Sequence, residues 1–188
     1  MSKISHFTHL ATSLVSIIAL PVLIVVIGGC YRDPKTERDK FIANHHDETF
    51  AAFKNKRVFI RGYDHEGRSI VFYSSATIDA LCSRPSIIIV YAAKDEHKAL
   101  RVDYKLLKPE CRKEVEKLEA DVKNTVATFI DYDITAIRAD STGNVYFRVA
   151  PADEIDVMKL SAQKTKGDTN QSLVGYVGVG GGWYKKIN

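Results

Sequence analysis

Residues 57–75 read RVFIRGYDHEGRSIVFYSS, and this stretch decides the fold class of the chain. Two runs rich in β-branched and aromatic residues, 57–63 and 69–75, flank a polar segment that contains Gly67. This arrangement predicts a β-hairpin whose connection uses the backbone freedom of glycine. Antiparallel strands that follow one another in sequence are therefore the first expected building block.

Two further pairs of strands are expected along the chain. Residues 87–91 form an unbroken apolar run, typical of a buried strand, whereas residues 100–105 alternate apolar and charged side chains as a half-exposed strand does. Residues 134–139 and 145–149 predict another hairpin, with its turn at 140–144.

Helices are expected on either side of the first two strand pairs. Asp33 is a good N-cap before Pro34, and a polar helix is expected from here to about Phe53. A second helix is expected from residues 108–110 onward, with apolar residues three and four positions apart. Its apolar face comprises Cys111, Val115, Leu118, Val122, Val126 and Phe129. The order of elements predicts an α+β fold, a two-layer sandwich of antiparallel hairpins with helices on one face.

An apolar leader precedes these elements. Residues 10–27 read LATSLVSIIALPVLIVVI, Lys3 is the one charged side chain before Cys30, and the junction is Ile27-Gly28-Gly29-Cys30. A short basic segment, an apolar run and small residues before a cleavage point are the parts of a secretory signal. The junction resembles the lipobox of bacterial lipoprotein signals, in which an aliphatic residue and two small residues precede an invariant cysteine.

This resemblance implies a membrane anchor. Cys30 would carry a lipid and become the new N-terminus, and two or three acyl chains would hold the protein stably in a membrane. Because Tyr31 rather than Asp follows the cysteine, the resemblance implies the outer membrane of a bacterial envelope rather than the inner one. The alternative is an uncleaved transmembrane helix, since the 18 residues from 10 to 27 reach the lower limit for a bilayer span.

The remaining cysteines predict one disulfide. Cys82 and Cys111 are left if Cys30 is lipidated, and an oxidising compartment favours their pairing. The bridge would close a loop of about 30 residues and would stabilise the domain by about 3.6 kcal/mol. Two buried, unpaired thiols are the alternative.

We divide the chain into four parts. These are a signal segment at 1–29, a lipidated N-terminus with a polar helix at 30–56, an α+β domain at 57–160, and a flexible linker with a glycine and aromatic tail at 161–188. The polar, Lys-, Thr- and Gly-rich composition from 161 to 172 is typical of a linker.

The tail is the most unusual part of the sequence. Residues 173–188 read LVGYVGVGGGWYKKIN and fit GxGxxG in no register, which argues against nucleotide binding. Tyr176, Trp183 and Tyr184 are costly to leave in water, so we expect them to dock on a partner or a sheet edge by strand addition. Deletion of residues 173–188 is then expected to leave the domain's stability nearly unchanged. A disordered terminus is the alternative.

No motif predicts a metal site or a catalytic centre. The stretch His45-His46-Asp47-Glu48 contains four potential metal ligands, but adjacent residues of a helix point about 100° apart. We therefore expect a solvated helix face here, and we expect no bound metal and no cofactor. There is no GxSxG or HExxH motif.

The balance of charges excludes one class of function. Lys and Arg number 27 against 23 Asp and Glu, which is too balanced for a dedicated nucleic-acid binder. We therefore predict an envelope lipoprotein that binds a protein partner without catalysis, in an assembly or exclusion role. The alternative is a small periplasmic enzyme or ligand-binding protein, which would need a pocket with converging polar groups.

Overall fold

The computed structural model describes residues 33–149, 154–161 and 173–187. One compact unit spans Pro34–Asn188 and is described by itself. Cys30 and the leader lie outside the described residues, so the lipobox and the anchor stay predictions. No helix in the described part of the chain is long and apolar enough to cross a membrane.

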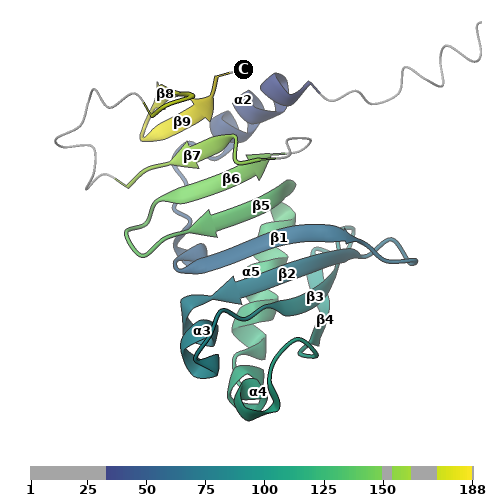
Figure 1. Ribbon diagram of the computed structural model, residues 1–188. Coiled ribbons are helices and arrows are strands. Elements are labelled where there is room, and N and C mark those ends of the chain that lie inside the picture. The colour runs from purple at the N-terminus through teal and green to yellow at the C-terminus, as the bar shows by residue number, and fades with distance from the viewer. Residues whose placement is uncertain (1–32, 150–153, 162–172, 188) are drawn as a thin grey trace, which may run out of the picture. The chain divides into compact units, whose positions relative to one another are not determined.

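The described residues form a single open antiparallel sheet (Figure 1). Its nine strands are β1 (Lys56–Tyr63), β2 (Ser69–Ser75), β3 (Ile88–Ala93), β4 (Lys98–Asp103), β5 (Ile134–Ala139), β6 (Val145–Val149), β7 (Val157–Lys159), β8 (Tyr176–Gly180) and β9 (Trp183–Lys186). They lie in the order β4-β3-β2-β1-β5-β6-β7-β9-β8. The three expected strand pairs are confirmed, because β1 pairs with β2, β3 with β4 and β5 with β6.

Four α-helices and one 3-10 helix accompany the sheet within the described residues. They are α2 (Pro34–Asn44), the 3-10 helix η1 (Ala51–Phe53), α3 (Ala76–Cys82), α4 (Pro109–Glu116) and α5 (Glu119–Asp131). The expected α+β class is confirmed.

The second expected helix is divided into α4 and α5. A turn in which the Leu118 amide donates to the Val115 carbonyl at 2.9 Å ends α4, where Glu116 and Lys117 are exposed. The predicted apolar face nonetheless faces the core. Its members Cys111, Val115, Val122, Val126 and Phe129 are buried, and Leu118 packs against them.

The expected polar helix is shorter than predicted, because it ends at Asn44 rather than near Phe53. The chain turns and then brings the rings of Phe50 and Phe53 into the core, where their burial outweighs further helical hydrogen bonds. The helix also belongs to the domain, because the ring centroids of Phe41 and Phe147 lie 5.0 Å apart. The predicted boundary at residue 56 is therefore wrong.

The C-terminal segment differs most from expectation. Strand β9 pairs with both β7 and β8, and Trp183 is 0% exposed, stacked on Phe147 with ring centroids 5.6 Å apart. Residues 173–187 are thus part of the domain rather than a flexible tail, and the predicted boundary at 160 is wrong for them. Because deletion of residues 173–188 would remove the buried Trp183 ring, we now expect the deletion to destabilise the domain. The expected linker lies largely at 162–172, outside the described residues.

The predicted disulfide is confirmed. Cys82 at the end of α3 and Cys111 in α4 are bonded, with Cα atoms 5.1 Å apart. Helix α3 was not expected from the sequence. The hydroxyl of Ser75 caps it by accepting from the Ile78 amide at 3.3 Å, so the strand β2 passes directly into the helix.

Alternation along the strands gives the sheet two different faces. One, here called the core face, packs against α5 and α2, and α5 lies behind β1, β2 and β3 in Figure 1. Its buried side chains include Val58, Val71, Val90, Ile137, Phe147 and Trp183. No helix of the described residues crosses the opposite face, here called the open face.

Candidate functional site

The open face is assembled by the register of the sheet. Arg57 lies opposite Arg138, Arg138 opposite Tyr146, and Tyr146 opposite Met158. Residues directly opposite each other in antiparallel strands project to the same face. These side chains from β1, β5, β6 and β7 therefore lie side by side, on the face that the core residues do not use.

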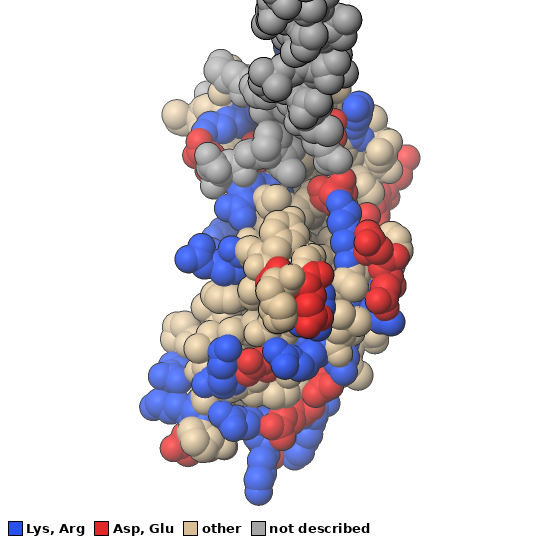
Figure 2. Space-filling view, turned by 90° about the vertical axis from the view of Figure 1, so that its right-hand side faces the viewer, with Lys and Arg blue, Asp and Glu red and all other residues tan. Residues whose placement is uncertain are grey.

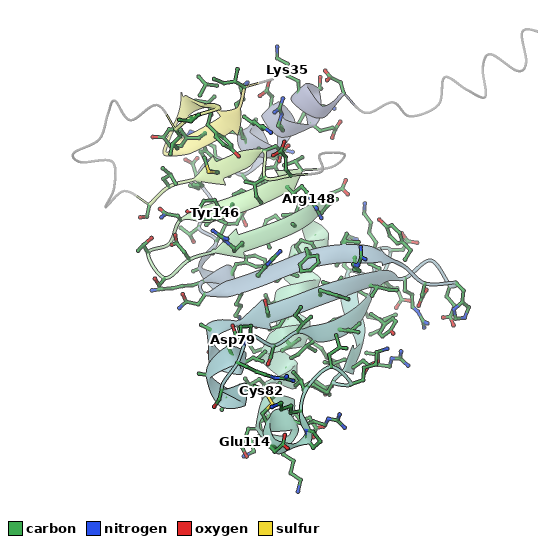
Figure 3. All side chains as sticks on the ribbon, in the orientation of Figure 1. Lys35, Asp79, Cys82, Glu114, Tyr146 and Arg148 are labelled. Carbon is green, nitrogen blue, oxygen red and sulfur yellow. A yellow bond between two sulfur atoms is a disulfide. The ribbon has the colours of Figure 1, made fainter. Side chains whose placement is uncertain are left out.

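A hollow of about 630 Å³ lies on this face, here called the arginine hollow. Its lining comprises Arg57, Phe59, Ala136, Ile137, Arg138, Tyr146, Arg148, Glu154, Ile155, Met158 and Tyr176. The volume falls within the range of protein ligand pockets. Figure 3 shows two of these side chains, Tyr146 and Arg148, on β6 at the middle of the sheet.

Aromatic rings and a hydroxyl orient the guanidinium groups of the hollow. The Cζ atom of Arg57 lies 5.0 Å from the centre of the Phe59 ring, and that of Arg138 lies 4.8 Å from the centre of the Tyr146 ring. The Arg148 Nε donates to Thr135 Oγ1 at 2.8 Å. Because guanidinium groups are attracted to ring faces, these contacts reduce the freedom of long side chains and prepare them for a ligand.

Positive charge exceeds negative charge in the hollow. Three arginines line it together with one acidic residue, Glu154, whose carboxylate pairs with the Lys186 ammonium. In Figure 2 the open face lies toward the left, and Lys and Arg side chains gather along that margin. The hollow is therefore suited to an anionic group.

A second hollow, here called the Lys159 groove, lies by the loop after α2. It has a volume of about 670 Å³ and is lined by Asp47, Glu48, Thr49, Phe50, Ala51, Lys54, Ala139, Thr142, Gly143, Val145, Lys159, Leu160, Ser161, Gly181 and Gly182. The Lys159 ammonium donates to the carbonyls of His46 and Glu48 at 2.8 and 2.7 Å and lies 4.9 Å from the Trp183 ring centre. Burial lowers the pKa of this ammonium. These bonds tie β7 to the loop after α2.

Gly182 makes the close approach of β9 and the neighbouring loop possible. Its φ is +81°, and a Cβ atom here would lie 2.7 Å from the Leu160 carbonyl oxygen. The Leu160 amide in turn donates to the Gly182 carbonyl at 2.8 Å. The glycine-rich sequence before Trp183 therefore serves strand pairing rather than flexibility.

A hydrogen-bonded chain of side chains lies beside the groove. The Tyr132 hydroxyl donates to one oxygen of Glu48, and the other oxygen lies 2.6 Å from His45 Nδ1. Burial, followed by the nearby Glu48 carboxylate, raises the pKa of Tyr132. His45 and Glu48 thus belong to a partly buried network rather than to the solvated helix face expected from the sequence.

The structure separates the three predicted partner-binding residues. Tyr176 lines the arginine hollow, and Tyr184 lies opposite Met158 on the open face. Trp183 points to the core face, where its Nε1 donates to the His46 carbonyl at 3.1 Å. A surface that includes Tyr176 and Tyr184 remains available to a partner, but the buried Trp183 ring does not.

Sequence reasoning missed the arginines of the hollow. The expected strand 145–149 contains Tyr146 and Arg148, but their meeting with Arg57 and Arg138 depends on the pairing of β1 with β5 and of β5 with β6. An arginine next to a buried apolar residue, at 57–58, 137–138 and 147–148, was the available signal.

Comparisons with protein-family models, with curated proteins and with solved structures find no match to this chain. Among the described residues, no group of three or more His, Cys, Asp or Glu side chains is placed to hold a metal ion. The chemistry of the site therefore has to be argued from its own residues.

Proposed function

We propose that this chain is a lipid-anchored protein of the bacterial envelope that binds a protein partner through its open face, without catalysis. The observation that carries the proposal is the open face itself, where half-buried aromatic rings and the exposed Arg57 and Arg138 line a hollow that no described helix covers. An assembly role or an exclusion role in the envelope follows from binding of this kind.

The composition of the open face supports a protein partner. Tyr and Arg are enriched among the residues that contribute most to protein–protein binding. Tyr146, Tyr176 and Tyr184 are partly buried, so their rings are already held in place before a partner arrives. We also propose that the fold is a two-layer sandwich, with the sheet as one layer and the helices on one of its faces as the other.

The anchor supports the location. Lipid on Cys30, implied by the Ile27-Gly28-Gly29-Cys30 junction, would hold the domain at the outer membrane, facing the periplasm or the cell surface. The disulfide between Cys82 and Cys111 is in keeping with an oxidising compartment.

A ligand-binding protein is the second candidate function. The Lys159 groove favours it, because a hollow of about 670 Å³ combines the apolar side chains of Phe50, Val145 and Leu160 with polar groups. The Lys159 ammonium already donates to two carbonyls, however, which leaves it less able to bind a ligand.

Photo-crosslinking in living cells tests the first candidate. A crosslinking amino acid at Tyr146, in the full chain, should give a discrete adduct with an envelope protein, whereas one at Lys113 on α4 should not. Phe59→Ala should weaken the Tyr146 adduct without lowering the melting temperature by more than a few degrees. Adducts of equal strength at both positions would contradict a specific open-face interaction.

The anchor needs a separate test. Radiolabelled palmitate should enter the full chain in a bacterial host, and Cys30→Ser should abolish labelling and leave the precursor uncleaved. Unchanged mature size and membrane attachment in that variant would contradict the lipid anchor and support the transmembrane alternative.

A further inference from the structure

We infer that Arg57, Arg138 and Arg148 form a carboxylate-binding site that receives an acidic segment of a protein partner. This inference rests on the proposed function, because it assigns the chemistry of the partner that the open face binds. It follows from the placement of the charges, from their orientation and from the shape of the hollow.

The placement of two arginines is unfavourable in the isolated domain. Arg57 and Arg138 lie directly opposite each other on β1 and β5. Like charges at directly opposed positions of an antiparallel pair destabilise the sheet. On the next strand Arg148 lies opposite Ala136, so three neighbouring strands bring positive charge to one hollow. The opposed pair of Arg57 and Arg138 is explained by a counter-charge that arrives from outside.

Among the residues that line the hollow, little counter-charge faces Arg57 and Arg138. Arg57 and Arg138 make no ion pair with any described residue, and their guanidinium groups lie over the rings of Phe59 and Tyr146 instead. The acidic lining residue Glu154 is paired with Lys186. A carboxylate entering the hollow would therefore meet oriented guanidinium groups, which bind carboxylates through paired hydrogen bonds.

The shape of the hollow favours a polypeptide over a membrane surface. About 630 Å³ is enough for several side chains, and the walls combine guanidinium groups with Phe59, Tyr146 and Met158. A flat bilayer surface cannot enter such a concavity, whereas an extended acidic segment with aromatic residues can place carboxylates and rings in it together. The expected ligand is a peptide of alternating acidic and aromatic character.

The test measures binding of two labelled peptides to the full chain purified in detergent. One peptide has four repeats of Glu-Glu-Phe, and the other has four repeats of Gln-Gln-Phe. We expect the acidic peptide to bind at least tenfold more tightly at low salt, and the difference to shrink as salt is raised. Arg57→Gln and Arg138→Gln should each weaken acidic-peptide binding about tenfold. Arg84→Gln, an exposed arginine outside the hollow, should leave it unchanged.

Several outcomes would overturn the inference. Equal affinity for the two peptides, or an equal effect of Arg84→Gln, would remove the carboxylate site. Stronger competition by inorganic phosphate or by vesicles containing anionic phospholipid would assign the arginines to phosphate groups instead. A melting temperature within a few degrees of the wild type shows that a variant is folded and that its loss of binding is local.

The same variants separate this inference from the proposed function. If Arg57→Gln and Arg138→Gln leave the Tyr146 crosslink to the envelope partner intact, the carboxylate site is wrong and the open-face interaction stands. If Tyr146 gives no discrete adduct although the acidic peptide binds as expected, the proposed partner interaction is wrong and the carboxylate site stands as a property of the hollow.

Discussion

The two faces of the sheet are made by the same strands but use different chemistry. On β1, β5 and β6 the core face carries Val58, Ile137 and Phe147, each at most 1% exposed, and the neighbouring positions on the open face carry arginine and tyrosine. The side chains of the core face therefore stabilise the fold, and those of the open face are available to bind a partner. Substitutions one residue apart should therefore differ, with a large loss of stability on the core face and a small loss on the open face.

The largest difference is expected between adjacent residues of β9. Trp183→Ala removes a fully buried ring from the core face and should lower the free energy of unfolding by about 3–5 kcal/mol. Tyr184→Ala, on the open face, should cost only about 1 kcal/mol. Chemical denaturation of both variants measures the difference, and similar values would show that β9 does not separate the two faces as described.

The disulfide should come next, because it acts on the helical side alone. Replacing both Cys82 and Cys111 by Ser frees the link between α3 and α4 and should reduce stability by about 3.6 kcal/mol according to the chain-entropy estimate. Binding of the Glu-Glu-Phe peptide to the open face should persist as long as the variant is folded. Loss of peptide binding in a folded variant would contradict the independence of the two faces.

Asp156 is a buried acid directly before β7, and it predicts a pH dependence of stability. It is 3% exposed, and burial raises its pKa to about 6, while the charges of Arg38 and Arg148 act in the opposite direction. The folded state therefore favours the protonated acid more than the unfolded state does. Its contribution is fully present below about pH 4 and is lost as the pH rises through about 6.

Asp156→Asn should remove this pH-dependent loss of stability, because an amide does not ionise. The amide oxygen can still accept the Val149 amide, which donates to the carboxylate at 2.9 Å in the wild type. We compare the change in the free energy of unfolding between pH 4 and pH 8 in the two proteins. This free energy should fall by about 2 kcal/mol more in the wild type than in the variant. Parallel curves for the two proteins between pH 4 and 8 would refute the assignment.

The smallest effect should come from the opposed arginines. In a double-mutant cycle with Arg57→Gln and Arg138→Gln, the coupling free energy should be unfavourable by about 0.2–1 kcal/mol and should diminish in salt. A favourable coupling would mean that the pair helps the fold, which would remove one argument for a counter-charge from a partner.

Local patterns predicted much of the fold. In the expected strand 145–149, Val145, Phe147 and Val149 are buried, because the two-residue period is a property of each strand by itself. The expected helical face from Cys111 to Phe129 also packs on the core, for the same reason at a period of 3.6.

Non-local pairing could not be predicted in the same way. Strands β8 and β9 lie in glycine-rich sequence, where few side chains mark an alternation, and their place depends on the distant strand β7. The arginine hollow has the same origin, since Arg57 and Arg138 meet through the pairing of β1 with β5. The sequence contains these residues, but their proximity is a property of the assembled sheet.

The contact between α2 and β9 has a consequence for the order of folding. Arg38 donates to the Lys186 carbonyl at 3.1 Å and Trp183 to the His46 carbonyl at 3.1 Å, across 148 and 137 positions of sequence. Closing such long loops is slow compared with forming hairpins. A chain that emerges N-terminus first must therefore keep the rings of Phe41, Phe50 and Phe147 without their Trp183 neighbour until β9 has emerged.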